Sequence, residues 1–177
     1  IVAGSTWLKD EQLLARYISD RTDVKLVLVP HEIDNDHLHE IFQLLEGRYV
    51  RYTEATAERM DNCRVLLVDT IGVLSSIYRY GNVAYVGGGF GVGIHNTLEA
   101  AVYGMPVVFG PNYNKFQEAK ELIECGAARS ISNYEECAKA LDEFFEKNEV
   151  ASKVAAEYVA SHTGATDLIY NYSLIGS

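Results

Sequence analysis

Residues 83–111 read VAYVGGGFGVGIHNTLEAAVYGMPVVFGP, and this segment defines the architecture of the chain. It begins and ends with an apolar, strand-like run, and between the two lie a glycine-rich loop and a helix-like run over 98–103. Five of the seven residues from Gly87 to Gly93 are glycine, which lets the backbone adopt positive φ and lets a ligand approach the main chain. Because the N-terminus of a helix presents unpaired N–H groups, the segment predicts a loop that holds the phosphate of a nucleotide-linked ligand.

Apolar strand-like runs and amphipathic helix-like runs alternate along the rest of the chain. The expected strands are 1–3, 25–29, 49–52, 64–68, 83–86, 106–109 and 128–131, and the expected helices are 10–20, 34–46, 70–80, 98–103, 114–125, 135–147 and 150–172. Strands that are apolar on both faces and alternate with helices are typical of a parallel sheet covered on both sides. The sequence therefore predicts an α/β fold with a doubly wound, Rossmann-like parallel sheet, ordered 3-2-1-4-5-6.

Ligands of such sheets bind outside the carboxyl ends of the strands, and polar or glycine residues follow several of the expected strands. Ser5 and Thr6 follow the first strand, where their hydroxyls could bind phosphate or sugar, or cap the next helix. The turn 69–72 could likewise bind a ligand or serve the structure alone, and as a ligand contact it could face a nucleobase. The glycine loop has neither the register of a dinucleotide fingerprint nor the lysine of a P-loop.

The start of the helix after the glycine loop carries four polar residues. Asn96 or Thr97 could cap this helix, and Glu99 could complement its dipole or accept hydrogen bonds from sugar hydroxyls. His95 could donate to a phosphate or fill the turn. We favour ligand roles for Asn96 and Glu99 over a purely structural role.

Composition excludes several classes of function. The formal net charge of −10 argues against nucleic acid and against anionic lipid as partners. No apolar run is long enough to predict a membrane span, and the first residues do not show the pattern expected of a signal peptide. Three cysteines without a CxxC pair support neither a disulfide framework nor a zinc site and are expected to be buried thiols. The acidic run 34–36 is expected to cap a helix rather than to bind metal, and neither metal nor cofactor is predicted.

A set of short motifs carries a resemblance to a known family. In order along the chain, they resemble the C-terminal half of the 3-deoxy-D-manno-octulosonic acid (Kdo) transferases, which are GT-B glycosyltransferases of lipopolysaccharide synthesis. The motifs are Gly4-Ser5-Thr6, Leu28-Val29-Pro30, Asp69-Thr70-Ile71-Gly72, Val86-Gly87-Gly88, His95-Asn96-Thr97-Leu98-Glu99-Ala100-Ala101, Gly104-Met105-Pro106-Val107 and Gly110-Pro111.

The resemblance implies that residues 1–177 are a single nucleotide-sugar-binding domain whose donor is CMP-Kdo. The donor contacts that it implies are Ser5, Thr6, Gly87, Gly88, Gly89, Asn96 and Glu99, with Ile71 and Gly72 near the cytidine. The catalytic carboxylate, the membrane anchor and the site for the acceptor, a lipid A precursor, are implied for an N-terminal lobe that this chain lacks. The chain alone would then be soluble and inactive, and the full-length protein would lie at the cytoplasmic face of the bacterial inner membrane.

Three positions depart from the family's pattern. The family has Arg-His-Pro-Glu after the second strand, whereas here Pro30 is followed by His31, so a positive charge is lost or His31 replaces it. Ile94 stands where the family has a second glycine before His-Asn, and Gly89 stands where it often has serine.

Other functions remain open at this level. The chain could belong to another GT-B enzyme that uses a UDP-sugar, such as a transferase or an epimerase. It could also be a non-catalytic nucleotide-binding module.

Overall fold

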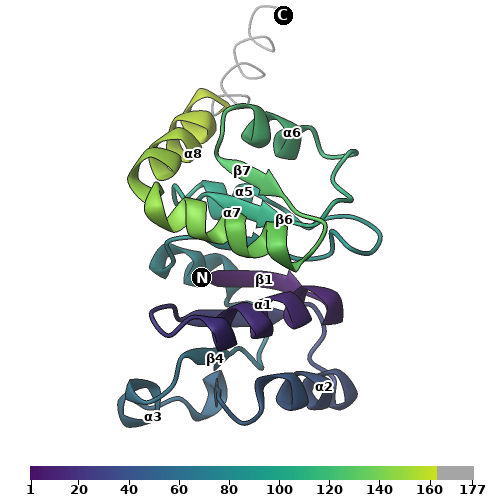
Figure 1. The fold of residues 1–177 in the computed structure, drawn as a ribbon, viewed down its shortest axis with the longest axis vertical. Coiled ribbons are helices and arrows are strands. Elements are labelled where there is room, and N and C mark those ends of the chain that lie inside the picture. Colours follow the sequence, from purple (N-terminus) through teal and green to yellow (C-terminus); the bar gives the residue numbers. More distant parts are fainter. Residues whose placement is uncertain (163–177) are drawn as a thin grey trace, which may run out of the picture.

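The computed structural model describes residues 1–162, which form a seven-stranded sheet with the order β3-β4-β2-β1-β5-β6-β7 (Figure 1). Every neighbouring pair of strands is parallel. The strands are β1 (Val2–Thr6), β2 (Leu26–Pro30), β3 (Val50–Arg51), β4 (Val65–Leu67), β5 (Ala84–Val86), β6 (Val107–Phe109) and β7 (Ala128–Ser130). The predicted fold class is confirmed, because the strands are apolar on both faces and each face is covered by helices.

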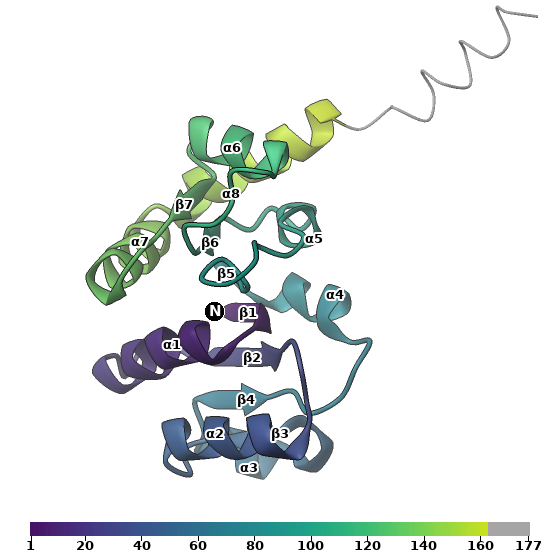
Figure 2. The same ribbon diagram turned by 90° about the vertical axis from the view of Figure 1, so that its right-hand side faces the viewer.

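Helices pack on both faces of the sheet and create two apolar cores (Figure 2). One face carries α1 (Leu8–Asp20), α2 (Asn35–Leu45) and α7 (Tyr134–Glu146). The other carries α4 (Leu74–Ile77), α5 (Leu98–Ala101), α6 (Gln117–Glu124) and α8 (Asn148–His162). The short helix α3 (Ala57–Asp61) and the 3-10 turns η1 (Tyr52–Glu54) and η2 (Tyr78–Tyr80) complete the described elements.

The predicted strand order needs one correction. The order 3-2-1-4-5-6 gave places to only six of the seven expected strands. In that order the run 49–52, third in the chain, would lie next to the second strand. The observed sheet matches that order only when β3 is left out, because β4 is the neighbour of β2 and β3 pairs beyond it at the edge. A strand of two residues has little hydrophobic pattern, so its place could not be read from periodicity.

Several expected helices are shorter in the structure. The helix predicted over 70–80 forms only α4 and η2, because the chain turns through Gly72 at φ +83° before the helix starts. The run 98–103 forms only the four residues of α5. The expected helix 150–172 matches α8 up to His162, and its remainder lies outside the described residues.

Two smaller expectations have mixed outcomes. Asp34 caps α2 as predicted, since its carboxylate accepts hydrogen bonds from the amides of Asp36 and His37. The cysteines were expected to be buried, but only Cys137 is; Cys63 is half-buried and Cys125 is exposed.

Candidate functional site

The candidate site lies at the edge of the sheet where β1, β2 and β5 end. β1 pairs with β2 on one side and with β5 on the other, so the loops that follow these three strands are neighbours. Ser5 bulges out of the β1–β2 pairing with φ +53°, an uncommon conformation for a residue other than glycine. Such strain is concentrated at functional sites, which draws attention to this edge.

The glycine loop packs tightly against the protein's own main chain. A Cβ on Gly87 would lie 2.2 Å from the carbonyl oxygen of Ser5, and one on Gly89 would lie 2.6 Å from Cα of Gly110. Gly88 has φ +89°, and its Cβ would meet the carbonyl oxygen of Gly93 at 2.5 Å. Sequence reasoning attributed these glycines to the approach of a ligand, but contacts within the protein already require all three.

Several amides of the glycine loop already donate hydrogen bonds to acceptors within the protein. The amide of Gly87 donates to the carbonyl of Gly4 at 2.9 Å, and that of Gly88 donates to the Asp10 carboxylate at 3.0 Å. The amides of Gly91, Gly93, Ile94 and His95 also donate to carbonyls within the chain. Within residues 1–162, no internal acceptor is found for the amides of Gly89, Phe90, Val92, Asn96 and Thr97. These amides, rather than those of Gly87 and Gly88, are therefore the ones left without an internal acceptor.

Asp10 is a buried carboxylate under the loop that sequence reasoning missed. It lies in the first turn of α1, is fully shielded from solvent, and accepts hydrogen bonds from the amides of Trp7 and Gly88, both at 3.0 Å, and from the Tyr85 hydroxyl at 2.8 Å. Burial raises the pKa of Asp10, while these three donors act in the opposite direction. Asp10 bonds back to the amide of the N-cap residue Trp7, as the acid of a capping box does, but Trp7 has no side-chain acceptor to complete the usual sequence signal.

Thr6 points into the protein rather than into the site. Its hydroxyl is fully buried and donates to Oε1 of Glu11 at 2.9 Å, and Nε2 of His37 lies 3.0 Å from the same oxygen. Burial raises the pKa of Glu11, and the neighbouring His37 opposes that shift. The Thr6 side chain can thus support the loop, but in this conformation it offers no hydroxyl to a ligand.

His31 and His95 come together although they follow different strands. The His31 and His95 rings stack with their centroids 4.4 Å apart, and the ring of Trp7 also stacks on His31, with a centroid distance of 4.8 Å. The indole Nε1 of Trp7 donates to Nε2 of His95 at 3.5 Å. Burial, and then the charge of His31, lower the pKa of His95. We call these three rings the Trp7–His31–His95 stack.

Asn96 and Glu99 lie beside the stack at the start of α5. Oδ1 of Asn96 accepts a hydrogen bond from the amide of Leu98, the first residue of α5, at 3.0 Å, while Thr97 occupies the N-cap position without a side-chain cap bond. Its Nδ2 donates to Oε1 of Glu99 at 3.3 Å, and both side chains are exposed. The hydroxyl of Thr97 is buried without a partner. Since α5 has four residues, its dipole is small, and the local amides matter more than the helix as a whole.

Ile71 and Gly72 lie on the turn after β4, which is separated from β1 by β2. Ile71 is 82% exposed, and a Cβ on Gly72 would meet nothing within 4 Å. The preceding Asp69 is committed to the protein, because its carboxylate accepts hydrogen bonds from Arg51 at 2.8 Å and from the Thr53 amide at 3.0 Å. The turn is open to a ligand but has no recorded contact with the stack.

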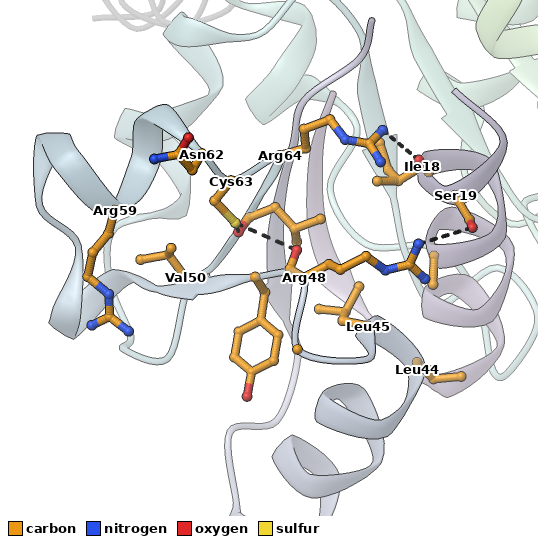
Figure 3. Close-up of a pocket in the computed structure, with 14 residues that line it drawn as sticks. Ile18, Ser19, Leu44, Leu45, Arg48, Val50, Arg59, Asn62, Cys63 and Arg64 are labelled. Atoms are coloured by element: carbon orange, nitrogen blue, oxygen red, sulfur yellow. Dashed lines mark hydrogen bonds between the residues drawn. The ribbon is translucent and has the colours of Figure 1, made fainter. Parts of the chain in front are cut away.

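Two cavities differ in their relation to this site. A cavity of about 370 Å³ adjoins the loop and is lined by Trp7, Leu8, Lys9, Asp10, Gly88, Phe90, Gly91 and Val92. A larger one, of about 440 Å³, lies between α1, α2, α3 and the starts of β3 and β4, at the opposite edge of the sheet (Figure 3). Size does not identify the site, because cavities of about 590 and 680 Å³ lie elsewhere on the described residues.

The arginines of the larger cavity have structural partners. Nη1 of Arg64 donates to the carbonyl of Ile18 at 2.8 Å and also to that of Arg21, so it satisfies the C-terminal end of α1 (Figure 3). Arg48 pairs with Glu46 at 3.0 Å, and Arg59 pairs with Glu54 at 2.9 Å. These charges are largely balanced within the protein, so the cavity gives no reason to move the site.

Within the described residues, no three histidine, cysteine or acidic side chains are grouped so that they could hold a metal ion. No helix among residues 1–162 has the length and apolar character needed to cross a membrane.

Comparison with known proteins places the chain in a family. It matches no protein-family model. It is 32% identical over 149 residues to the 3-deoxy-D-manno-octulosonic acid transferase of Aquifex aeolicus (strain VF5), a match that covers 81% of this chain and 41% of that protein. The enzyme of the same name from Rickettsia bellii is 27% identical over 158 residues, with 84% of this chain and 37% of that protein covered.

The fold agrees with these matches. The crystal structure of the C-terminal CMP-Kdo binding domain of WaaA from Acinetobacter baumannii superposes with a TM-score of 0.76 at 26% identity, over 90% of this chain and 86% of that one. The chain belongs to the Kdo transferase family. It corresponds to the C-terminal domain of these enzymes, and it spans less than half the length of the curated Kdo transferases quoted above.

Less similar structures show the fold alone. The sucrose-phosphate synthase of Thermosynechococcus elongatus superposes with a TM-score of 0.64 at 16% identity, and a putative UDP-N-acetylglucosamine 2-epimerase from Listeria monocytogenes does so with a TM-score of 0.58 at 16% identity. Both share the α/β fold of this chain, which is that of a GT-B glycosyltransferase domain.

Proposed function

We propose that this chain is the donor-binding lobe of a Kdo transferase and that its ligand is CMP-Kdo. The likeness over 90% of its length to a CMP-Kdo binding domain carries the proposal. The open edge of the sheet supports it, because Ser5, the stack and the start of α5 gather there around unpaired amides. Residues 1–177 would then act as one nucleotide-sugar-binding domain.

The contacts that we propose follow from which groups remain free. The amides of Gly89, Phe90, Asn96 and Thr97 would face the phosphate, and the exposed Asn96 and Glu99 side chains would accept or donate bonds to the sugar. Ser5 would contact the donor through its hydroxyl, whereas Gly87, Gly88 and Thr6 would shape the loop. The open turn at Ile71 and Gly72 would lie near the cytidine.

The chemistry that this lobe would support is an inverting transfer. An acceptor hydroxyl attacks the anomeric carbon of Kdo while CMP departs, and negative charge grows on the leaving phosphate. Amides fixed in place before the reaction stabilise such charge because they need not reorient. The N-terminal lobe of the full-length enzyme would supply the base that takes the hydroxyl proton. It would also bind the lipid A precursor that carries this hydroxyl, and it would contact the inner membrane.

A second candidate is a lobe that binds a UDP-sugar. Only the fold supports it, through the structures of about 16% identity noted above. Calorimetry of the chain with CMP, UDP and ADP separates the candidates. We expect CMP to bind at least about tenfold more tightly than UDP, since the hydrogen-bonding groups of the nucleobase decide which nucleotide fits the site. Tighter binding of UDP would remove the cytidine assignment, and no binding of any nucleotide would remove the donor-lobe proposal.

Glu99→Gln is expected to weaken CMP-Kdo binding about tenfold, because a carboxylate accepts stronger hydrogen bonds from sugar hydroxyls than an amide does. The melting temperature should stay within about 2 °C, since Glu99 is exposed and its one recorded side-chain partner is Asn96.

The matched control for this variant is Glu135→Gln. Glu135 is also an exposed acid in the first turn of a helix, α7, but α7 lies on the other face of the sheet. If Glu99→Gln melts several degrees lower and binds the donor normally, Glu99 serves α5 and not the ligand.

A further inference from the structure

The Trp7–His31–His95 stack lies against the glycine loop and a buried carboxylate. A Cβ on Gly88 would lie 3.2 Å from Nε2 of His95, and the amide of the same Gly88 is bonded to Asp10. Asp10 also accepts the amide of Trp7, whose ring donates to His95. Trp7 and Gly88 therefore link His95 with Asp10.

The contact with Trp7 favours a neutral His95 in the free protein. An indole N–H can only donate, so its 3.5 Å approach to Nε2 of His95 suits a ring that accepts there and carries its proton on Nδ1. The lowered pKa of His95 agrees with this state. A neutral Nε2 beside the loop offers a lone pair, not a proton, to whatever occupies the site.

The four titratable groups around His95 lie on α1, on α5 and after β2, and they do not act in one direction. The neighbouring ring of His31, after β2, opposes a positive charge on His95. Asp10 on α1 and Glu99 on α5 favour such a charge. Lys9, which lines the cavity beside Trp7, is a further cation at this edge. Among these groups, the buried Asp10 carboxylate is the one best fixed to act as a counter-charge, because three hydrogen bonds hold it in place.

We infer that His95 takes up one proton from solvent when an anionic donor phosphate binds beside it. The proton adds to Nε2, the Trp7 bond to that nitrogen breaks, and the new N–H donates to the phosphate, with Asp10 as the buried counter-charge. This inference rests on the proposed function. It gives a site in a chain of net charge −10 a cation that exists only while the ligand is bound.

The test is calorimetry of the full chain with the methyl ester of CMP, whose phosphodiester does not titrate near neutral pH. In buffers of different protonation enthalpy at about pH 7, we expect the observed heat to vary with the buffer in the direction of proton uptake. Affinity should fall by up to about tenfold per pH unit as the pH rises from about 6 to about 8. Below the pKa of His95 in the ligand-free protein, the affinity should level off, because His95 is then protonated both before and after the ester binds.

Two variants assign the proton. In His95→Gln the dependence on buffer and on pH should disappear, whereas His39→Gln should keep both. His39 is an exposed histidine on α2 whose recorded side-chain partner is Gln43, away from the stack. If His95→Gln no longer binds the ester, the NMR titration of His95 in the parent chain decides the question: its midpoint should move to higher pH when the ester is added.

The outcomes for the inference and for the proposed function differ. Ester binding without proton uptake, or a His95 midpoint that does not move, overturns the inference and leaves the donor lobe intact. Failure of CMP and of its ester to bind at all overturns both.

Discussion

Gly88→Ala is expected to abolish measurable CMP binding and to lower the free energy of unfolding by about 3 kcal/mol. Gly88 has φ +89°, where an L-residue is strained, and its new Cβ would meet the carbonyl oxygen of Gly93 at 2.5 Å. Main chain cannot rotate away as a side chain can, so the loop between Gly88 and Gly93 must shift. That shift moves the amides of Gly89 and Phe90, on which binding is proposed to depend. Calorimetry with CMP and urea unfolding measure the two effects.

Gly91→Ala is the control for this variant in the same loop. Its Cβ would have Gly88 carbonyl oxygen at 3.6 Å as its nearest neighbour, which is an ordinary contact, and its φ is not positive. We expect stability within about 0.5 kcal/mol of the parent. If both variants bind CMP like the parent chain, the loop geometry is irrelevant to the ligand.

Asp10→Ala is expected to cost about 3–5 kcal/mol of stability, the largest effect of any single side chain that we discuss. The change would leave two amides, of Trp7 and Gly88, and the Tyr85 hydroxyl without their acceptor in the interior. Urea unfolding at constant pH measures this cost. CMP binding by the folded fraction should also weaken, because the Gly88 amide anchors the loop.

Asp34→Ala separates this role from ordinary helix capping. The Asp34 carboxylate accepts hydrogen bonds from two amides at the start of α2, just as Asp10 accepts hydrogen bonds from the amides of Trp7 and Gly88. Unlike Asp10, Asp34 is exposed. Its loss should cost about 1 kcal/mol. Equal costs for the two variants would mean that Asp10 is only a cap and does not organise the loop.

The fold could be predicted because its main signal is local. Runs such as Leu26–Pro30 and Val107–Phe109 are apolar on both faces, and that pattern has one common solution, a parallel sheet between two helix layers. The length of α4 and α5 and the place of β3 could not be predicted. They depend on turns and on edge pairing, for which single residues such as Gly72 carry the information.

The candidate site could be proposed from the sequence, but its hydrogen bonding could not. Polar residues after β1, β2 and β5 predicted a site at the edge of the sheet where the structure brings His31 and His95 together. Binding of a ligand there stays a prediction. Asp10 was missed because a carboxylate in the first turn of a helix is usually exposed. Its burial depends on Tyr85 and Gly88, which are distant in sequence. Likewise, no local pattern shows that the Gly88 amide is already occupied.

The central claim is that main-chain amides at this edge hold the donor's phosphate. A crystal structure of the chain soaked in CMP tests it most directly. We expect the phosphate within hydrogen-bonding distance of the amides of Gly89, Phe90, Asn96 or Thr97, with His95 beside it. A CMP molecule bound elsewhere, for example in the cavity of Arg48 and Arg64, would contradict this account.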